Sequence, residues 1–202
     1  CTMFKKIFVP VLDEFIATPA YSNGNWGASV GMSYVAAAVL LNDMDMYKKG
    51  VDFYLNGNDN GTIKNYVDGD TGQCQERGSG FWIACLSVTC EIAYKQGTDL
   101  YEILDNRLRK GFEYTSMYNI GHDDVPFKTW TDITGKYCSW TKISADGRGQ
   151  FRPVFEMVYN HYVNRKGLNM VYTKEVLDKI RPEGYYYEHF GYGTFLFSDK
   201  KK

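Results

Sequence analysis

Apolar residues recur at helical spacing through most of this chain. In residues 3–18 they fall at i, i+3, i+4 and i+7 with charged residues between them, which is the pattern of an amphipathic helix. Residues 28–41 are apolar on nearly every face and rich in Ala, Gly and Ser, so we expect a buried helix that approaches its neighbours closely. This spacing constrains the fold more than any other feature, because it favours an all-α architecture.

Five more segments continue the helical pattern, at 44–55, 81–95, 100–118, 153–164 and 174–180. Most of them end near a glycine, the residue that most readily takes the left-handed conformation after a helix. The tail at 185–197 alternates weakly like a strand, and its aromatic and glycine content leaves its structure open. A succession of helix pairs suits an α/α toroid or solenoid.

The length and the near-zero net charge limit the classes of function. A chain of 202 residues suits one domain, which we expect at 1–197, with 198–202 as a frayed lysine-rich tail. Lys and Arg number 23 against 24 Asp and Glu, so the net charge of -1 gives no field that would gather nucleic acid. The longest aliphatic run, 35–41, is far below the roughly 20 residues that span a bilayer. We therefore expect neither a nucleic-acid partner nor a membrane span.

The segment Ser22-Asn23-Gly24-Asn25-Trp26-Gly27 directly precedes the most apolar helix. In the simpler interpretation Asn23 or Asn25 caps that helix, a role that asparagine often fills. In the functional interpretation the Asn25 amide hydrogen-bonds a carboxylate and the Trp26 ring stacks on a sugar. The two roles are compatible within one segment.

A second group of polar residues lies between positions 147 and 162. If a helix begins directly after Arg152, then Arg152, Glu156 and Tyr159 share one face to within about 20°. The simpler interpretation is an i, i+4 ion pair between Arg152 and Glu156 on a solvated surface. Because Arg148 and His161 are close in the sequence, the same stripe would instead offer anion binding and proton transfer.

Aromatic residues also gather in the loop at 119–151 and in the tail. Tyr137 and Trp140 in the loop, and His189 in the tail, suit a sugar-binding platform, although each is also consistent with loop packing. The chain has 3 His without HExxH spacing and 5 Cys without a CxxC pair, so we expect no metal site.

Several of these segments together resemble the alginate lyase family of polysaccharide lyases. Their order and spacing cover nearly the whole chain. The matching stretches are 23–27 (NGNWG), 59–63 (DNGTI), 72–76 (GQCQE), 90–93 (CEIA), 105–108 (DNRL), 111–115 (GFEYT), 148–162 and 181–185 (RPEGY). There is one departure: after Glu76 the family usually continues Ser-Gly-Arg-Asp-Gln-x-His, whereas this chain continues Arg77-Gly78-Ser79-Gly80-Phe81. The Arg, Asp and His of that motif are therefore missing.

The resemblance implies a complete or incomplete (α/α) toroid of antiparallel helix pairs whose concave face binds an acidic polysaccharide. It implies a periplasmic or secreted protein, of which these residues form the C-terminal part. The implied reaction is β-elimination at a uronic acid, with no cofactor. By position, Asn25 would neutralise the uronate carboxylate and Tyr159 would transfer the proton. Arg152 would lower the pKa of Tyr159 or hold the substrate, and His161 would support them.

The same resemblance places Trp26 beside the uronate carboxylate and Tyr137 or Trp140 along the subsite. With Arg148 and His189, which their residue types make candidates, these are the predicted substrate-binding residues. In the family, the His of the Ser-Gly-Arg-Asp-Gln-x-His motif commonly serves as a catalytic base or as a neutralising group, and this chain lacks it. Loss of one member of a cooperating set of catalytic residues can remove most of the rate. The alternative is therefore a catalytically impaired protein with the lyase fold that only binds acidic glycans.

Overall fold

The structure of the chain, a computed structural model, describes residues 2–18, 24–75 and 82–198. Every regular element within these ranges is a helix, and one isolated bridge between extended residues joins Val67 to Cys74. The predicted all-α class is therefore confirmed. Asn23, the stretch 77–81 and residues 199–202 of the expected frayed tail lie outside the described residues.

Most helices occur where the apolar spacing predicts them. The tail, whose structure the sequence left open, ends in a short helix. The elements are η1 (Phe4–Phe8, a π-helical turn), α1 (Val9–Ala17), α2 (Gly24–Leu41), α3 (Met44–Asn56), α4 (Ile63–Tyr66), α5 (Ile83–Lys95), α6 (Ile103–Asn119), α7 (Glu156–Tyr159), η2 (Asn160–Arg165, also π-helical), α8 (Val171–Ile180) and α9 (Gly193–Phe197).

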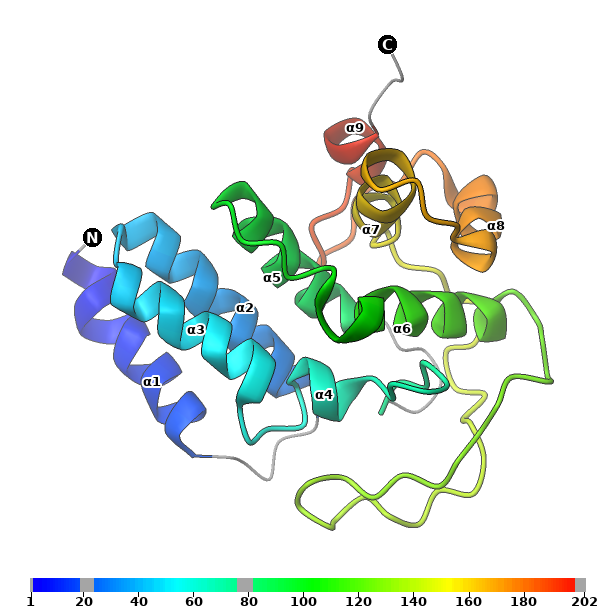
Figure 1. The fold of residues 1–202 in the computed structure, drawn as a ribbon, viewed down its shortest axis with the longest axis horizontal. Coiled ribbons are helices and arrows are strands. Elements are labelled where there is room, and N and C mark those ends of the chain that lie inside the picture. The colour runs from blue at the N-terminus through cyan, green and yellow to red at the C-terminus, as the bar shows by residue number, and fades with distance from the viewer. Residues whose placement is uncertain (1, 19–23, 76–81, 199–202) are drawn as a thin grey trace.

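Helix α2 is the buried helix of the N-terminal half, where it packs against α1, α3 and α5 (Figure 1). Val35 in its middle is completely shielded from solvent. A Cβ atom built on Gly31 would lie 3.2 Å from the ring of Phe53 in α3, so the small residue permits this close approach. The prediction of a buried helix with small contact residues is confirmed.

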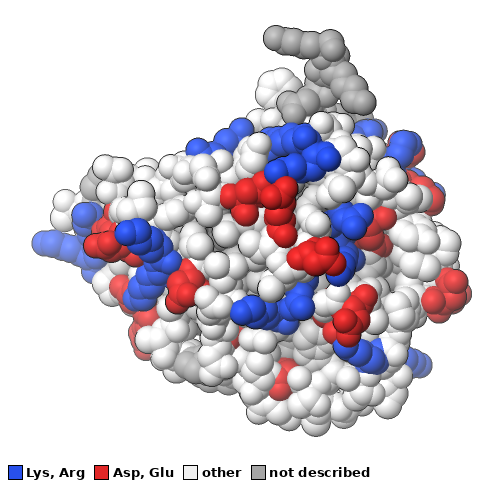
Figure 2. Space-filling model, in the orientation of Figure 1, with Lys and Arg blue, Asp and Glu red and all other residues white. Residues whose placement is uncertain are grey.

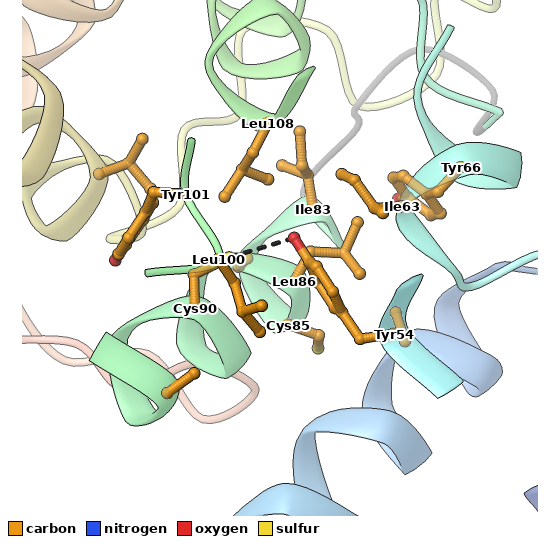
Figure 3. Close-up of a cluster of buried hydrophobic side chains, with 14 of the residues drawn as sticks. Tyr54, Ile63, Tyr66, Ile83, Cys85, Leu86, Cys90, Leu100, Tyr101 and Leu108 are labelled. Carbon is orange, nitrogen blue, oxygen red and sulfur yellow. Dashed lines mark hydrogen bonds between the residues drawn. The ribbon is translucent and has the colours of Figure 1, made fainter. Parts of the chain in front are cut away.

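A core of apolar and aromatic side chains joins α3, α4, α5 and α6 (Figure 3). The Tyr54 hydroxyl of α3 lies 3.1 Å from the Cys90 sulfur of α5, and both side chains are buried. Ile63, Leu86 and Leu108 pack in the same core and are nearly inaccessible to solvent. This core ties the N-terminal helices to α6, which in turn packs against α8.

Helix α6 begins with a left-handed turn that the sequence pattern does not predict. Leu104, Asp105 and Asn106 have φ angles of 51°, 56° and 52°, so the right-handed helix begins at Arg107. The Lys110 ammonium donates to Asp105 Oδ2 at 2.8 Å across this turn. The predicted helix at 100–118 therefore begins later than expected, because apolar spacing carries no information on the sign of φ.

The predicted helix at 153–164 begins at Glu156 instead of directly after Arg152. Glu183 Oε1 accepts hydrogen bonds from the backbone N–H groups of Phe155 and Glu156, at 2.8 and 3.3 Å. Because a carboxylate from the tail satisfies these donors, the helix starts there, and Arg152 lies outside it. The expected polar stripe of Arg152, Glu156 and Tyr159 on one helix face is therefore wrong.

Replacing Gly61 by alanine is expected to lower the free energy of unfolding by about 1–3 kcal/mol. A Cβ atom at this position would lie 2.0 Å from the backbone nitrogen of Ala28, so the loop before α4 would have to move away from α2. Gly184→Ala is the matched control, since a Cβ atom there would meet nothing within 4 Å. Urea denaturation measures both variants, and equal stability of the two would contradict this account of the contact.

Candidate functional site

A pocket of about 370 Å³ opens between α5, the segment that leads into α7, and the C-terminal tail. Apolar side chains form most of its wall, including Met32, Val88, Val154, Met157 and Phe197. Three titratable carboxyl and imidazole groups also line it, those of Glu183, Glu188 and His189. A concave apolar pocket with a few polar groups is the usual form of a ligand site.

Arg152, Tyr186 and His189 form a stack of side chains next to this pocket. The Arg152 guanidinium carbon lies 4.2 Å from the centre of the Tyr186 ring. The rings of Tyr186 and His189 lie 5.8 Å apart and within 22° of parallel. Trp82 also packs against His189 in an edge-to-face arrangement, with ring centres 5.8 Å apart. We call these residues the Arg152–Tyr186–His189 stack; it combines a cation, a phenol and an imidazole, groups that can bind an anion and move protons.

The imidazole of His189 is poised as a base. Its partial burial, and secondarily the charge of Arg152, lower its pKa, so the ring is neutral at pH 7 and free to accept a proton. Glu188 opposes this shift, and Glu188 Oε2 lies 3.8 Å from Arg152 Nη1. A neutral imidazole that lines the pocket and a guanidinium beside the pocket therefore both contact Tyr186.

Glu183 is the most buried carboxyl group of the pocket, with 4% of its surface exposed. Its Oε1 accepts the two backbone N–H groups before and at the start of α7, whereas its Oε2 is buried without a hydrogen-bond partner. Burial raises the pKa of Glu183 to about 7, against the opposing effect of the two backbone donors. This carboxyl therefore changes charge near neutral pH.

Glu156 anchors the tail to α7 and is not a surface residue. It is fully buried, and it accepts hydrogen bonds from Arg181 Nε at 2.8 Å, from Arg181 Nη2 at 2.6 Å and from the Thr194 hydroxyl at 3.0 Å. The expected i, i+4 pair with Arg152 is replaced by this pair with Arg181. Arg181 and Glu183 belong to the RPEGY stretch, for which no role was predicted from the sequence. Two charged residues on either side of a proline, directly after a helix, are the signal that could have identified them.

Tyr159 and His161 lie apart from the Arg152–Tyr186–His189 stack. Tyr159 is partly buried, and its ring centre lies 5.3 Å from the guanidinium carbon of Arg181. His161 is completely buried and stacks on Tyr101 with ring centres 3.8 Å apart. Neither ring nitrogen of His161 has a hydrogen-bond partner, and burial lowers its pKa to about 4. As the chain is folded here, His161 contacts no open surface.

Arg148 clamps the loop at 119–151 to the end of α6. Its Nε donates to the carbonyl of Tyr118 at 2.9 Å, its Nη2 to the carbonyl of His122 at 2.8 Å, and its Nη1 pairs with Asp123 at 2.6 Å. The guanidinium also lies over the Tyr118 ring, 4.2 Å from its centre. These contacts give the predicted substrate-binding arginine a structural role.

Two other predicted residues, Tyr137 and Trp140, lie near a hydrogen bond between Asn60 and Asp132. Asn60 Nδ2 donates to Asp132 Oδ2 at 2.8 Å, and the backbone N–H of Tyr137 donates to Asp132 Oδ1 at 2.8 Å. The Tyr137 and Trp140 rings lie 5.7 Å apart. We call this region the Asn60–Asp132 corner.

The first turn of α2 completes the corner. A Cβ atom built on Gly24 would lie 3.0 Å from the carbonyl oxygen of Asn60, so this turn packs directly on the loop that carries Asn60. Asn25 lies inside the helix, so it is not the capping residue, and its Oδ1 is buried without a partner. Trp26 is 53% exposed and its ring lies 6.2 Å from that of Phe15.

The predicted site residues therefore fall into separate groups. The corner lies where the first turn of α2 packs on the loop before α4, whereas the pocket is lined by residues of α5, α7 and the C-terminal tail (Figure 1 shows these elements). The structure brings Arg152 and His189 together around Tyr186, beside the pocket, and it brings Tyr137 and Trp140 together near Asp132. Asn25 and Trp26 lie in the turn of α2 that packs on the Asn60 loop, and the Trp26 ring lies near Phe15. It does not bring Asn25 and Tyr159 to a common site.

Comparisons with protein-family models, curated proteins and solved structures find no match to this chain. Within the described ranges no helix is both long and apolar enough to cross a bilayer. On the face drawn in Figure 2, Lys and Arg side chains are interspersed with Asp and Glu side chains, without a large patch of one sign. An anionic ligand on that face would therefore depend on individual cations.

Proposed function

We propose that this chain is similar in function to the alginate lyases and cleaves a uronic-acid polysaccharide by β-elimination at the rim of the pocket. The observation that carries the proposal is the Arg152–Tyr186–His189 stack, because β-elimination needs a cation for the uronate carboxylate, a base and a proton donor. The proposal includes an incomplete (α/α) toroid as the wider fold, an acidic polysaccharide as partner, and a periplasmic or secreted location.

The three side chains have separate roles in this reaction. Arg152 binds the uronate carboxylate, and His189 removes the proton from the ring carbon next to it. The electron pair released forms a double bond to the neighbouring ring carbon, and the bond from that carbon to the departing glycosidic oxygen breaks. The Tyr186 hydroxyl protonates that oxygen, and the proton on His189 returns to Tyr186 through solvent. The products are an unsaturated uronate and a free sugar hydroxyl.

The assay follows the near-ultraviolet absorbance of the unsaturated product during incubation with alginate, glucuronan and glycosaminoglycans. A rise in absorbance with one of these substrates is the expected result. Binding of a glycan without any rise would favour the second candidate function, which is recognition of acidic glycans without cleavage.

The Asn60–Asp132 corner favours this second candidate. The turn of α2 that packs on the Asn60 loop carries the exposed Trp26. The paired rings of Tyr137 and Trp140 have a cation beside them, since Lys136 Nζ lies 5.2 Å from the Tyr137 ring centre. Aromatic rings with an adjacent cation suit an acidic sugar. None of the residues named at the corner is a histidine that could serve as a base. This region would therefore bind a glycan without removing the proton next to the uronate carboxylate.

Tyr186→Phe is expected to abolish elimination while glycan binding persists, because only the hydroxyl that protonates the departing oxygen is lost. The family resemblance gives this role to Tyr159, so Tyr159→Phe is the matched rival variant and removes the same single atom. Initial rates for both variants, with circular dichroism to verify folding, decide between the two phenols. Full activity of Tyr186→Phe together with an inactive Tyr159→Phe would overturn the assignment to the stack.

A further inference from the structure

The depth of the pocket differs chemically from its rim. Its wall is apolar, and the one deeply buried charged group that lines it among the described residues is Glu183. A glycan carries many hydroxyl groups, and this wall offers few hydrogen-bond partners for them. The interior of the pocket therefore has a ligand chemistry that elimination at the rim does not explain.

Within the part of the chain that the structure describes, no cation pairs with the Glu183 carboxylate. One oxygen is held by two backbone N–H groups, and the other is buried without a partner. The nearby cation Arg181 donates to both oxygens of Glu156 and to neither oxygen of Glu183. A buried carboxylate that has no cation is costly, so a ligand that supplies one gains affinity.

The backbone leaves space for this carboxylate. A Cβ atom built on Gly193 would lie 1.9 Å from Glu183 Oε2, so any other residue at position 193 would displace the carboxyl group. The Thr194 hydroxyl accepts a hydrogen bond from the Glu183 backbone N–H at 3.0 Å and donates one to the Glu156 carboxylate. These two bonds hold the backbone at Glu183 against α7 and α9. The carboxyl is thus held in place at the pocket.

We propose that the pocket binds a small, mainly apolar molecule with one primary amine, whose ammonium group pairs with the Glu183 carboxylate. The apolar wall supplies burial of the hydrocarbon part, and the ammonium neutralises the charge that the protein leaves unpaired. This inference is independent of the proposed elimination, because it requires neither the stack nor a glycan.

The other charged groups around Glu183 favour a cation over an anion. Glu156 from α7 and Arg181 from the segment after α8 neutralise each other. Glu188 and Arg152 at the rim also form a pair, and His189 is neutral at pH 7. The ionised Glu183 is therefore the unbalanced charge at the pocket.

Calorimetric titration with three probes of one shape tests the proposal at pH 8. Phenethylamine is expected to bind about tenfold more tightly than 2-phenylethanol, the difference that a charge-assisted hydrogen bond supplies. Phenylacetate, which carries the opposite charge, is expected not to bind. Equal affinity for the amine and the alcohol would overturn the proposal, and this comparison uses the unaltered chain.

Glu183→Gln tests the assignment to this carboxyl. The variant is expected to bind the amine and the alcohol equally, whereas Glu188→Gln, which changes another carboxyl of the same pocket, keeps the preference. Lowering the pH from 8 to 6 is expected to weaken amine binding to the unaltered chain and not to Glu183→Gln. A preference that persists in Glu183→Gln would place the ammonium elsewhere. None of these results depends on whether the chain cleaves a glycan.

Discussion

Arg181→Met is expected to destabilise the fold by about 3 kcal/mol, because it leaves the Glu156 carboxylate buried without a cation. Glu156 is completely shielded from solvent and accepts two hydrogen bonds from the Arg181 guanidinium. About a third of the Arg181 side chain is exposed, at 34%, so we take the lower end of the range for a broken buried pair. Urea denaturation at pH 7 measures the loss.

A second substitution separates the loss of the pair from the loss of packing. In Arg181→Met/Glu156→Met no charge remains buried, so we expect the double variant to recover most of the stability lost in Arg181→Met. Lys174→Met removes the partner of Asp178 in an ion pair that is about half exposed on both sides, and it should cost about 0.5 kcal/mol or less. A loss in Arg181→Met no larger than that in Lys174→Met would contradict the importance of the buried pair.

The helices were predictable because their signal is local. Helix α2 is apolar all round within its own 18 residues, and α3 has its apolar face within 13. Long-range contacts were not predictable in this way. Glu156 meets Arg181, 25 residues later, and the capping of α7 by Glu183 moves Arg152 out of the helix on which the expected stripe depends.

The candidate site shows the same division. His189 and the neighbouring tyrosines were recognisable from their residue types, as were Trp26, Tyr137 and Trp140. The pairing of Arg152 with Tyr186 was not, since 34 positions separate them and the tail has no periodicity to place it. His161 was selected because histidine is often a catalytic residue. In the folded chain its ring packs against the rings of Tyr94 and Tyr101, and these contacts depend on the tertiary fold and cannot be inferred from the residue type.

His161→Phe is expected to make stability fall as the pH rises between about 4.5 and 6.5, a range over which the stability of the unaltered chain changes little. The pKa of His161 is lowered from 6.5 to about 4, so in this range the unfolded chain binds a proton at His161 and the folded chain does not. The contribution of His161 to stability is therefore present above pH 6.5 and is lost as the pH falls, by about 3 kcal/mol in total. Phenylalanine keeps the stacked ring and removes this dependence.

Glu183 acts in the opposite direction over the same range, which makes the two groups a matched pair. Its pKa is raised from 4.5 to about 7, so the folded chain holds a proton that the unfolded chain has released, and stability falls by about 3 kcal/mol as the pH rises. In the unaltered chain the two contributions largely cancel. We expect urea denaturation from pH 4.5 to 7.5 to show that the stability of His161→Phe falls as the pH rises, whereas the stability of Glu183→Gln increases. The lowered pKa of His189 adds to the increase in Glu183→Gln. Parallel profiles for the two variants would contradict the opposed titration of these buried groups.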